Sequence, residues 1–161
     1  MTMTDEMAAE VAQLLIQRGE SVAVAESSAG GLISAALLAV PGASGYYRGG
    51  VVVYTGDGKQ RLAGMTPEQL ARDRSATAPH TALLAQVISD RMGATWGLAE
   101  TGAAGPAGNR YGDAAGHAAI AVAGPLNRSQ IIETGDSDRR RNMEAFALAA
   151  LRLLREALSG G

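Results

Sequence analysis

The stretch SVAVAESSAGGLISAALLAV, residues 21–40, joins two different patterns across a turn. Residues 21–25 form a short apolar run, which is typical of a buried strand. Residues 32–40 have a helical pattern that a Pro-Gly pair ends. Between the two lie a glutamate, two serines and two glycines. A strand that turns directly into a helix in this way indicates an α/β protein.

The same alternation continues along the rest of the chain. Apolar spacing, N-cap residues and glycine or proline breaks predict helices over 5–18, 57–62, 67–72, 81–92 and 139–158, and strands over 51–54, 96–100, 117–123 and 130–133. The glycine-rich segment 102–116 is expected to be a loop. We therefore predict a three-layer α/β/α sandwich around a mixed sheet, with residues 1–161 forming a single domain.

Composition excludes several classes of function. The chain has 161 residues, 47% of them hydrophobic and 19% charged, with a net charge of -2, so nothing indicates the basic face of a nucleic-acid-binding protein. The sequence contains no cysteine, which excludes disulfide bonds and catalysis by a thiolate. Two histidines and scattered acidic residues predict no metal site. No apolar run could span a bilayer and the N-terminus does not resemble a signal peptide, so a cytoplasmic protein without membrane contact is expected.

The turn between the first strand and the following helix is a candidate anion site. Free N–H groups at a helix N-terminus attract anions, and Gly30 and Gly31 allow close approach of a ligand. Ser27 could bond that ligand. Helix capping with tight packing explains the same residues, and the local pattern by itself favours capping.

A second candidate region surrounds the strand predicted over 51–54. Ser44 precedes this strand, Tyr54 ends it and Lys59 follows it. A lysine beside a serine can act as a base if burial lowers its pKa. Spacing alone favours a simpler interpretation, in which Ser44 is a turn residue and Lys59 is a solvated charge.

A third candidate is the sequence ETGAAGPAG, residues 100–108. Thr101 lies at a predicted strand end, and Gly102 and Gly105 expose backbone N–H groups. Such a loop could form an oxyanion hole or a phosphate nest. An ordinary connection has the same composition, and periodicity does not decide between them.

A fourth candidate is the cationic start of the last helix. Three arginines, residues 139–141, occupy its first turn, where cations oppose the helix dipole. Either Asp136 and Asp138 compensate them or a bound phosphate does. His80 and His117 are isolated in the sequence, which predicts packing or surface positions for both.

Taken in order, these stretches resemble the CinA C-terminal domain family, whose motifs are close to A-E-S-C-T-G-G, P-G-S-S-x-x-x-x-G-x-V-x-Y-S-N-x-x-K, T-G-I-A-G-P and G-D-R. The resemblance covers nearly the whole chain, and the order and spacing of the motifs make it specific. The matching residues are Ala25-Glu26-Ser27, Gly30-Gly31, Pro41-Gly42, Ser44, Gly50, Val53-Tyr54, Lys59, Thr101-Gly102, Ala104-Gly105-Pro106, Gly135-Asp136 and Arg141.

The resemblance implies a stand-alone nicotinamide-nucleotide amidohydrolase, without the N-terminal domain of longer members. Such an enzyme converts nicotinamide mononucleotide to nicotinic acid mononucleotide and ammonia, in NAD salvage. It implies a homodimer and no metal or cofactor. By motif position, the resemblance makes Ser44 the nucleophile, Lys59 its base and Arg141 a substrate ligand, with Ser27, Tyr54 and Thr101 supporting the site.

The chain departs from the family pattern in the segment 107–116, where Ala114-Ala115-Gly116 stands in place of a P-V-G end, and at two pairs of residues. Ser28-Ala29 replaces Cys-Thr, and Thr55-Gly56 replaces Ser-Asn. A hydroxyl is therefore missing at Ala29 and a side-chain amide at Gly56. These departures favour an alternative, a catalytically weak module that binds a nucleotide or a partner and is linked to competence or DNA damage. Retention of Lys59 with Ser44 favours the enzyme.

Overall fold

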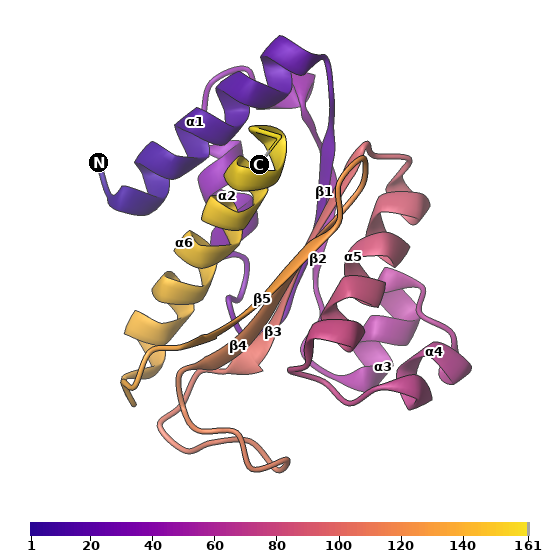
Figure 1. Cartoon of the computed structure of the whole chain (residues 1–161), viewed down its shortest axis with the longest axis vertical. Coiled ribbons are helices and arrows are strands. Elements are labelled where there is room, and N and C mark those ends of the chain that lie inside the picture. The colour runs from indigo at the N-terminus through magenta and orange to yellow at the C-terminus, as the bar shows by residue number, and fades with distance from the viewer. Residues whose placement is uncertain (161) are drawn as a thin grey trace.

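A five-stranded mixed sheet runs through the protein in the order β2-β1-β3-β4-β5 (Figure 1). The computed structural model describes residues 1–160. β1 is parallel to β2 and β3, whereas β4 is antiparallel to both of its neighbours. The mixed sheet agrees with the prediction. The strands are β1 (Val22–Glu26), β2 (Tyr47–Val52), β3 (Trp96–Ala103), β4 (His117–Ala123) and β5 (Arg128–Glu133).

Helices cover both faces of the sheet, which confirms the three-layer sandwich (Figure 1). One face carries α1 (Met3–Arg18), α2 (Leu32–Leu38) and α6 (Arg139–Leu158), and the other carries α3 (Gly56–Gly58), α4 (Pro67–Arg72) and α5 (Ala78–Met92). A 3₁₀ turn, Ala43–Gly45, precedes β2, and a π-helical turn, Lys59–Ala63, follows α3. Within residues 1–160, no helix has the length and apolarity that crossing a membrane requires.

The helix ends follow from local residue chemistry. Thr66 and Gln69 form a capping box with Pro67 in the first turn of α4. Gly19 adopts a left-handed conformation, φ 64°, at the end of α1. The Asp138 side chain accepts a hydrogen bond from the backbone N–H of Arg141 at the start of α6. These boundaries agree with those predicted from the sequence.

The side chains of β1 alternate between two hydrophobic cores. Val22 and Val24 belong to the core beneath α1, α2 and α6, whereas Ala23 and Ala25 belong to the core beneath α5. Every residue of β1 and β4 is buried, as expected for strands that are covered on both faces. Small residues facing α5 allow this helix to approach the sheet closely.

Four strands differ from the predicted boundaries: β1 is shifted by one residue, β5 begins two residues earlier, and β2 and β3 differ more. β2 begins at Tyr47 and ends at Val52, so it lies earlier in the chain than the apolar run 51–54 suggested. β2 is an edge strand and pairs only with β1. Its Gly49 and Gly50 are packed closely, since a Cβ would lie 2.5 Å from the Met92 side chain at Gly49 and 2.9 Å from the Val24 carbonyl oxygen at Gly50. β3 continues to Ala103, because β4 pairs with it over that length.

His117 connects β4 to two neighbouring segments. Its Nδ1 lies 2.6 Å from Oε1 of Glu133 on β5, and its Nε2 lies 2.8 Å from the carbonyl oxygen of Ala76. Both partners are acceptors, so the imidazolium form can donate to both. Burial lowers the pKa of His117, but the bonds to Ala76 and Glu133 outweigh it and the pKa is raised.

The closeness of α5 to the sheet gives a stability prediction. A Cβ at Gly97 on β3 would overlap the backbone carbonyl of Ala85 on α5. We expect Gly97→Ala to destabilise the protein by about 1–3 kcal/mol in chemical denaturation. Gly45→Ala, where a Cβ meets nothing within 4 Å, is the matched control and should shift stability by less than about 0.5 kcal/mol. Equal effects would contradict this packing.

His117 gives a prediction for pH. Because the pKa of His117 is raised above its ordinary value of 6.5, its stabilising contribution is complete below about pH 6.5. That contribution is lost as pH rises through the folded-state pKa. The free energy of unfolding of His117→Gln, measured from pH 5.5 to 9, should therefore differ from wild type most at the acidic end. A constant difference would show that His117 does not titrate in this range.

Candidate functional site

A cleft of about 350 Å³ opens where β1 and β3 end. Both strands run in the same direction, so their carboxyl ends lie at one edge of the sheet. Ligands bind preferentially in this position in open α/β sheets. The cleft is lined by Ser27, Tyr54, Thr55, Gly56, Lys59, Ser75, Ala76, Thr101, Gly102, Asn109, Arg110 and Tyr111.

Lys59 is the buried cation of the cleft. It begins the π-helical turn after α3, and it is only 3% exposed. Its Nζ lies 2.8 Å from Oγ of Ser75 and 2.9 Å from Nε2 of His80. Burial lowers the pKa of Lys59 from 10.5 to about 8, although the charge of Glu100 opposes this shift. The amine is therefore partly uncharged at mildly alkaline pH.

Toward Lys59, the Nε2 atom of His80 acts as a hydrogen-bond acceptor and not as a donor. Its Nδ1 lies 3.2 Å from the carbonyl oxygen of Asp73, so Nδ1 carries the proton and Nε2 carries a lone pair. Burial, reinforced by the nearby charge of Lys59, lowers the pKa of His80 to about 4. At neutral pH the uncharged imidazole of His80 therefore accepts a hydrogen bond from Nζ of Lys59.

Two buried carboxylates shape the turn that follows β1. Glu26 accepts hydrogen bonds from the backbone N–H groups of Ile33 and Ser34, at 3.0 and 2.9 Å. Glu100 accepts from the N–H groups of Ser27 and Ala29, at 3.0 and 2.8 Å. Burial raises the pKa of Glu100.

The proposed anion site in this turn is therefore corrected. The N–H of Gly30 donates to the carbonyl of Ser27, and protein carboxylates already hold several neighbouring donors. Neither Gly30 nor Gly31 lines the cleft. Their left-handed φ values of 66° and 100° serve the turn itself. The start of α2 is thus satisfied by Glu26, and α2 has no side-chain cap from its N-cap residue Gly31.

Ser27, which the resemblance makes a supporting residue, is one of the residues that line the cleft. The side chain lines the cleft, and no hydrogen bond of its Oγ occurs within residues 1–160. Thr101 also lines the cleft, where its Oγ1 accepts from the N–H of Ala76 at 3.0 Å and lies 2.7 Å from Oγ1 of Thr81. Gly102 lies beside it. Gly105 is outside the lining.

A different arginine from the expected one lies near the cleft. Arg139 donates to the carbonyl of Gly105 at 2.6 Å and to the hydroxyl of Tyr54 at 3.0 Å. Arg141 is exposed and pairs with Asp136 at 2.8 Å, an ion pair that lowers the pKa of Asp136 to about 2. Asp136 and Asp138 thus compensate Arg141, which does not line the cleft.

Ser44 does not lie with Lys59. It is exposed in the 3₁₀ turn before β2, whereas Lys59 follows the other end of that strand. Five steps along β2 alone extend about 17 Å. Ser44 is absent from the lining of the cleft and from the hydrogen bonds of Lys59 within residues 1–160. The predicted pairing of these two residues within one chain is therefore corrected.

The sequence pattern missed several residues in and around the cleft. Ser75 and His80 contact Lys59 across 16 and 21 residues of chain. Arg110 and Tyr111 come from the glycine-rich loop and line the cleft, where the guanidinium carbon of Arg110 lies 4.9 Å from the tyrosine ring centre. None of them lies within a few residues of the lysine, so only the fold brings them together.

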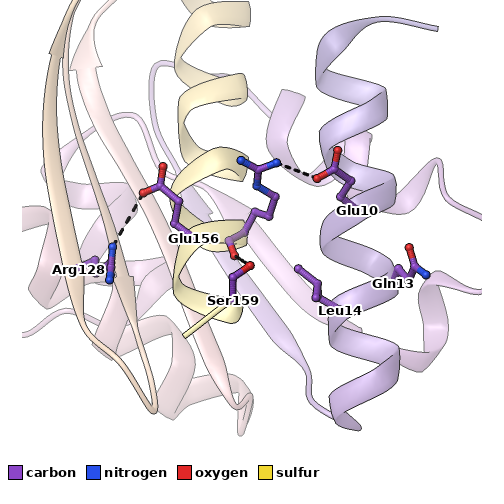
Figure 2. A pocket seen from close by; sticks show the side chains of 7 residues that line it. Glu10, Gln13, Leu14, Arg128, Glu156 and Ser159 are labelled. Carbon is purple, nitrogen blue, oxygen red and sulfur yellow. Dashed lines mark hydrogen bonds and ion pairs between the residues drawn. The ribbon is translucent and has the colours of Figure 1, made fainter. Parts of the chain in front are cut away.

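A larger groove of about 520 Å³ lies between α1 and α6 on the opposite helical layer (Figure 2). Its charged side chains pair with one another. Arg155 lies 2.9 Å from Glu10, and Arg128 lies 4.0 Å from Glu156. It contains no counterpart to the buried lysine of the first cleft, so the first cleft is the candidate site. Within residues 1–160 there is also no cluster of side chains suited to hold a metal ion.

Comparison with known proteins places this fold in a family. The family model described as CinA C-terminal domain matches residues 4–158. A CinA-like protein of Anaeromyxobacter sp. (strain K) is 39% identical over 154 residues, which is 96% of this chain and 38% of the relative. A CinA-like protein of Prochlorococcus marinus (strain MIT 9313) is 42% identical over 75% of this chain and 28% of its own length. The chain thus spans less than two fifths of these relatives.

Solved structures agree with the sequence comparison. A CinA superfamily protein from Klebsiella pneumoniae 700603 has a TM-score of 0.91 at 28% identity, covering 98% of this chain and 99% of that one. The competence/damage inducible protein CihA from Agrobacterium tumefaciens has a TM-score of 0.89 at 28% identity, covering 99% and 97%. The chain belongs to the CinA C-terminal domain family.

Proposed function

We propose that this chain is an amidohydrolase that converts nicotinamide mononucleotide to nicotinic acid mononucleotide and ammonia. The observation that carries the proposal is the Lys59 amine, which is buried, has a pKa of about 8 and lies in a cleft lined by hydroxyl groups. Perturbed lysines in clefts are typical of catalytic bases. Membership of the CinA C-terminal domain family is consistent with this reaction.

In the proposed reaction, uncharged Lys59 accepts the proton of an attacking hydroxyl as that oxygen bonds to the carboxamide carbon. The ammonium of Lys59 then returns the proton to the departing amino group, which leaves as ammonia. Water cleaves the resulting ester by the same proton transfers in reverse. The Tyr54 hydroxyl accepts its hydrogen bond from Arg139, so its own proton remains available for the developing oxyanion.

The cationic groups around the cleft suit a 5′-phosphate. Arg110 lines the cleft, and Arg139 reaches its rim through Tyr54. Arginine binds phosphate by charge-assisted hydrogen bonds, and each guanidinium carries five N–H donors. These two arginines take the role that sequence position assigned to Arg141.

The departures from the family motifs differ in their consequences for the site. Ser28 donates to the buried carboxylate of Glu100, and Ala29 lies in the hydrophobic core. Neither side chain lines the cleft, so these two changes remove no group from the proposed substrate site. Gly56 does line the cleft, and the missing amide there leaves room beside Thr55.

A second candidate function is nucleotide binding without efficient turnover. The separation of Ser44 from Lys59 favours it, because the hydroxyl implied by the resemblance is not available to the base within one chain. Calorimetry with nicotinamide mononucleotide and with its acid product separates the two candidates when combined with an ammonia assay. Binding of both nucleotides without ammonia release would support the second.

Ammonia release from nicotinamide mononucleotide tests the first proposal. Lys59→Met should lower kcat by about 100-fold or more, because a general base contributes 10²–10⁴-fold to rate. Arg140→Ala, which changes an exposed ion pair outside the cleft, is the matched control and should retain wild-type turnover. A Lys59→Met protein that folds and releases ammonia at the wild-type rate would exclude Lys59 as the base.

The pH dependence of turnover tests the state of Lys59. The active form of a general base is unprotonated, and the pKa of Lys59 lies at about 8. We therefore expect kcat/KM to rise with pH and to level off above an inflection near pH 8. A profile that falls between pH 7 and 9 would contradict catalysis by the neutral amine.

A further inference from the structure

We propose that Tyr111 determines the specificity of this cleft by stacking on the pyridinium ring of the substrate, and that Arg110 leaves the tyrosine ring to bind the 5′-phosphate of the same molecule. The proposal rests on the amidohydrolase function above and adds to it a discrimination between charged and uncharged rings. Both residues lie in the segment 107–116, where the chain departs from the family pattern, so no family motif assigns them a role.

A tight turn presents Tyr111 to the cleft that it lines. The Oδ1 atom of Asn109 accepts hydrogen bonds from the backbone N–H groups of Tyr111 and Asp113, both at 3.0 Å. The Nδ2 atom of Asn109 donates to the Asp113 carboxylate at 2.8 Å, and its backbone N–H donates to the Asp113 carbonyl at 3.1 Å. A Cβ at Gly108 would overlap that carbonyl oxygen. The turn therefore has a defined conformation, and its tyrosine needs little further ordering to bind a ligand.

Arg74 joins this turn to the segment before α5. Its Nη1 and Nη2 atoms lie 2.8 and 3.2 Å from the two carboxylate oxygens of Asp113, which makes a bidentate ion pair. Nη1 also donates to the carbonyl of Ser75 at 3.0 Å. The guanidinium carbon lies 5.0 Å from the centre of the Tyr111 ring. Arg74 is therefore a fixed neighbour of the tyrosine, and it connects two segments that line the cleft.

Arg110 is a second cation beside the same ring, but it is held by fewer contacts. Its guanidinium carbon lies 4.9 Å from the ring centre, and Nη2 donates to the Tyr111 hydroxyl at 2.8 Å. Arg110 is exposed, and it makes no ion pair with another residue of the range 1–160. A cation–π contact at an exposed site is weak. Of the two arginines, Arg110 is therefore the one that a ligand can displace from the tyrosine ring.

Nicotinamide mononucleotide carries both charges that such an exchange requires. The glycosylated ring nitrogen makes the pyridine ring a flat cation, and the 5′-phosphate is an anion. The face of a tyrosine ring attracts a flat cation, and a phosphate holds a guanidinium more strongly than a neutral hydroxyl does. When the pyridinium stacks on Tyr111, Arg110 moves to the phosphate, which separates the like charges of the ring and the guanidinium. The preferred ligand is therefore a mononucleotide with a positively charged aromatic ring.

Calorimetry with nicotinic acid mononucleotide, the reaction product, tests Tyr111 without turnover. Tyr111→Leu should weaken binding about tenfold, because leucine is apolar but has no π-system for the pyridinium. Tyr111→Phe is the matched control, since it keeps the ring and loses the hydroxyl, and it should bind within about twofold of wild type. Equal weakening in the two variants, or wild-type binding by Tyr111→Leu, would overturn the role of the ring.

Reduced nicotinamide mononucleotide tests the discrimination itself. It has the same carboxamide and phosphate, but its dihydropyridine ring is uncharged and not aromatic. The ratio of kcat/KM for the oxidised substrate to kcat/KM for the reduced one should be about tenfold lower in Tyr111→Leu than in wild type. Comparison of the two proteins cancels the different intrinsic reactivity of the two amides. An unchanged ratio would contradict stacking of the charged ring on Tyr111.

Nicotinamide riboside, which has the pyridinium ring but no phosphate, tests Arg110. Arg110→Met should lower kcat/KM for nicotinamide mononucleotide about tenfold or more, because a charge-assisted contact to the phosphate is lost. The same variant should retain or increase kcat/KM for the riboside, because no guanidinium then competes for the tyrosine ring. Arg140→Met, which removes a positive charge outside the cleft, should change neither value. Equal losses with the mononucleotide and the riboside in Arg110→Met would overturn the exchange.

These measurements separate failure of the two proposals. If the wild-type protein releases no ammonia, the proposed function fails, and binding of nicotinic acid mononucleotide decides the role of Tyr111. Binding that depends on Tyr111 would still support the stacking site, whereas a wild-type protein that does not bind this nucleotide would overturn it. Ammonia release that is unchanged in Tyr111→Leu and Arg110→Met would overturn the present proposal and leave the amidohydrolase function standing. Thermal unfolding of each variant shows whether the fold is kept.

Discussion

Two buried carboxylates at paired positions on β1 and β3 hold the turn beside the cleft. Glu26 and Glu100 are paired in the register of these strands, and both are fully buried. A buried carboxylate is tolerated only when hydrogen bonds replace its water. Glu26 therefore holds the first turn of α2, and Glu100 holds the turn at Ser27 and Ala29. These hydrogen bonds connect the strand ends, the turn and the start of α2 behind Ser27, which lines the cleft.

The carboxylate of Glu100 also affects the pKa of the buried Lys59. Burial lowers the pKa of Lys59, and the charge of Glu100 partly opposes that shift, which leaves a pKa of about 8. Without a nearby carboxylate, a buried lysine would lose its proton more readily. The lysine can therefore change between ammonium and amine close to neutral pH, as a residue that both takes and gives a proton must. His80 stays neutral beside it because its own pKa is about 4.

The departures from the family motifs become understandable in three dimensions. Ser28, where the family pattern has Cys, supports Glu100 with its hydroxyl. Ala29 packs in the core next to α2 and α6. Both positions thus serve the wall behind the cleft rather than the cleft itself. Tertiary contacts also explain the arginines of α6, since Asp136 and Asp138 hold Arg141 while Arg139 turns toward Tyr54.

The sequence by itself determined the α/β class, the three layers and the position of nearly every helix, because these follow from local periodicity, caps and breaks. It also identified Lys59, Tyr54, Ser27 and Thr101, which the structure brings to one cleft. Only the tertiary structure separated Ser44 from Lys59, since the direction of β2 puts them at opposite ends of a strand. It alone brought Ser75 and His80 to the amine, because hydrogen bonds between residues distant in the chain leave no periodic signal.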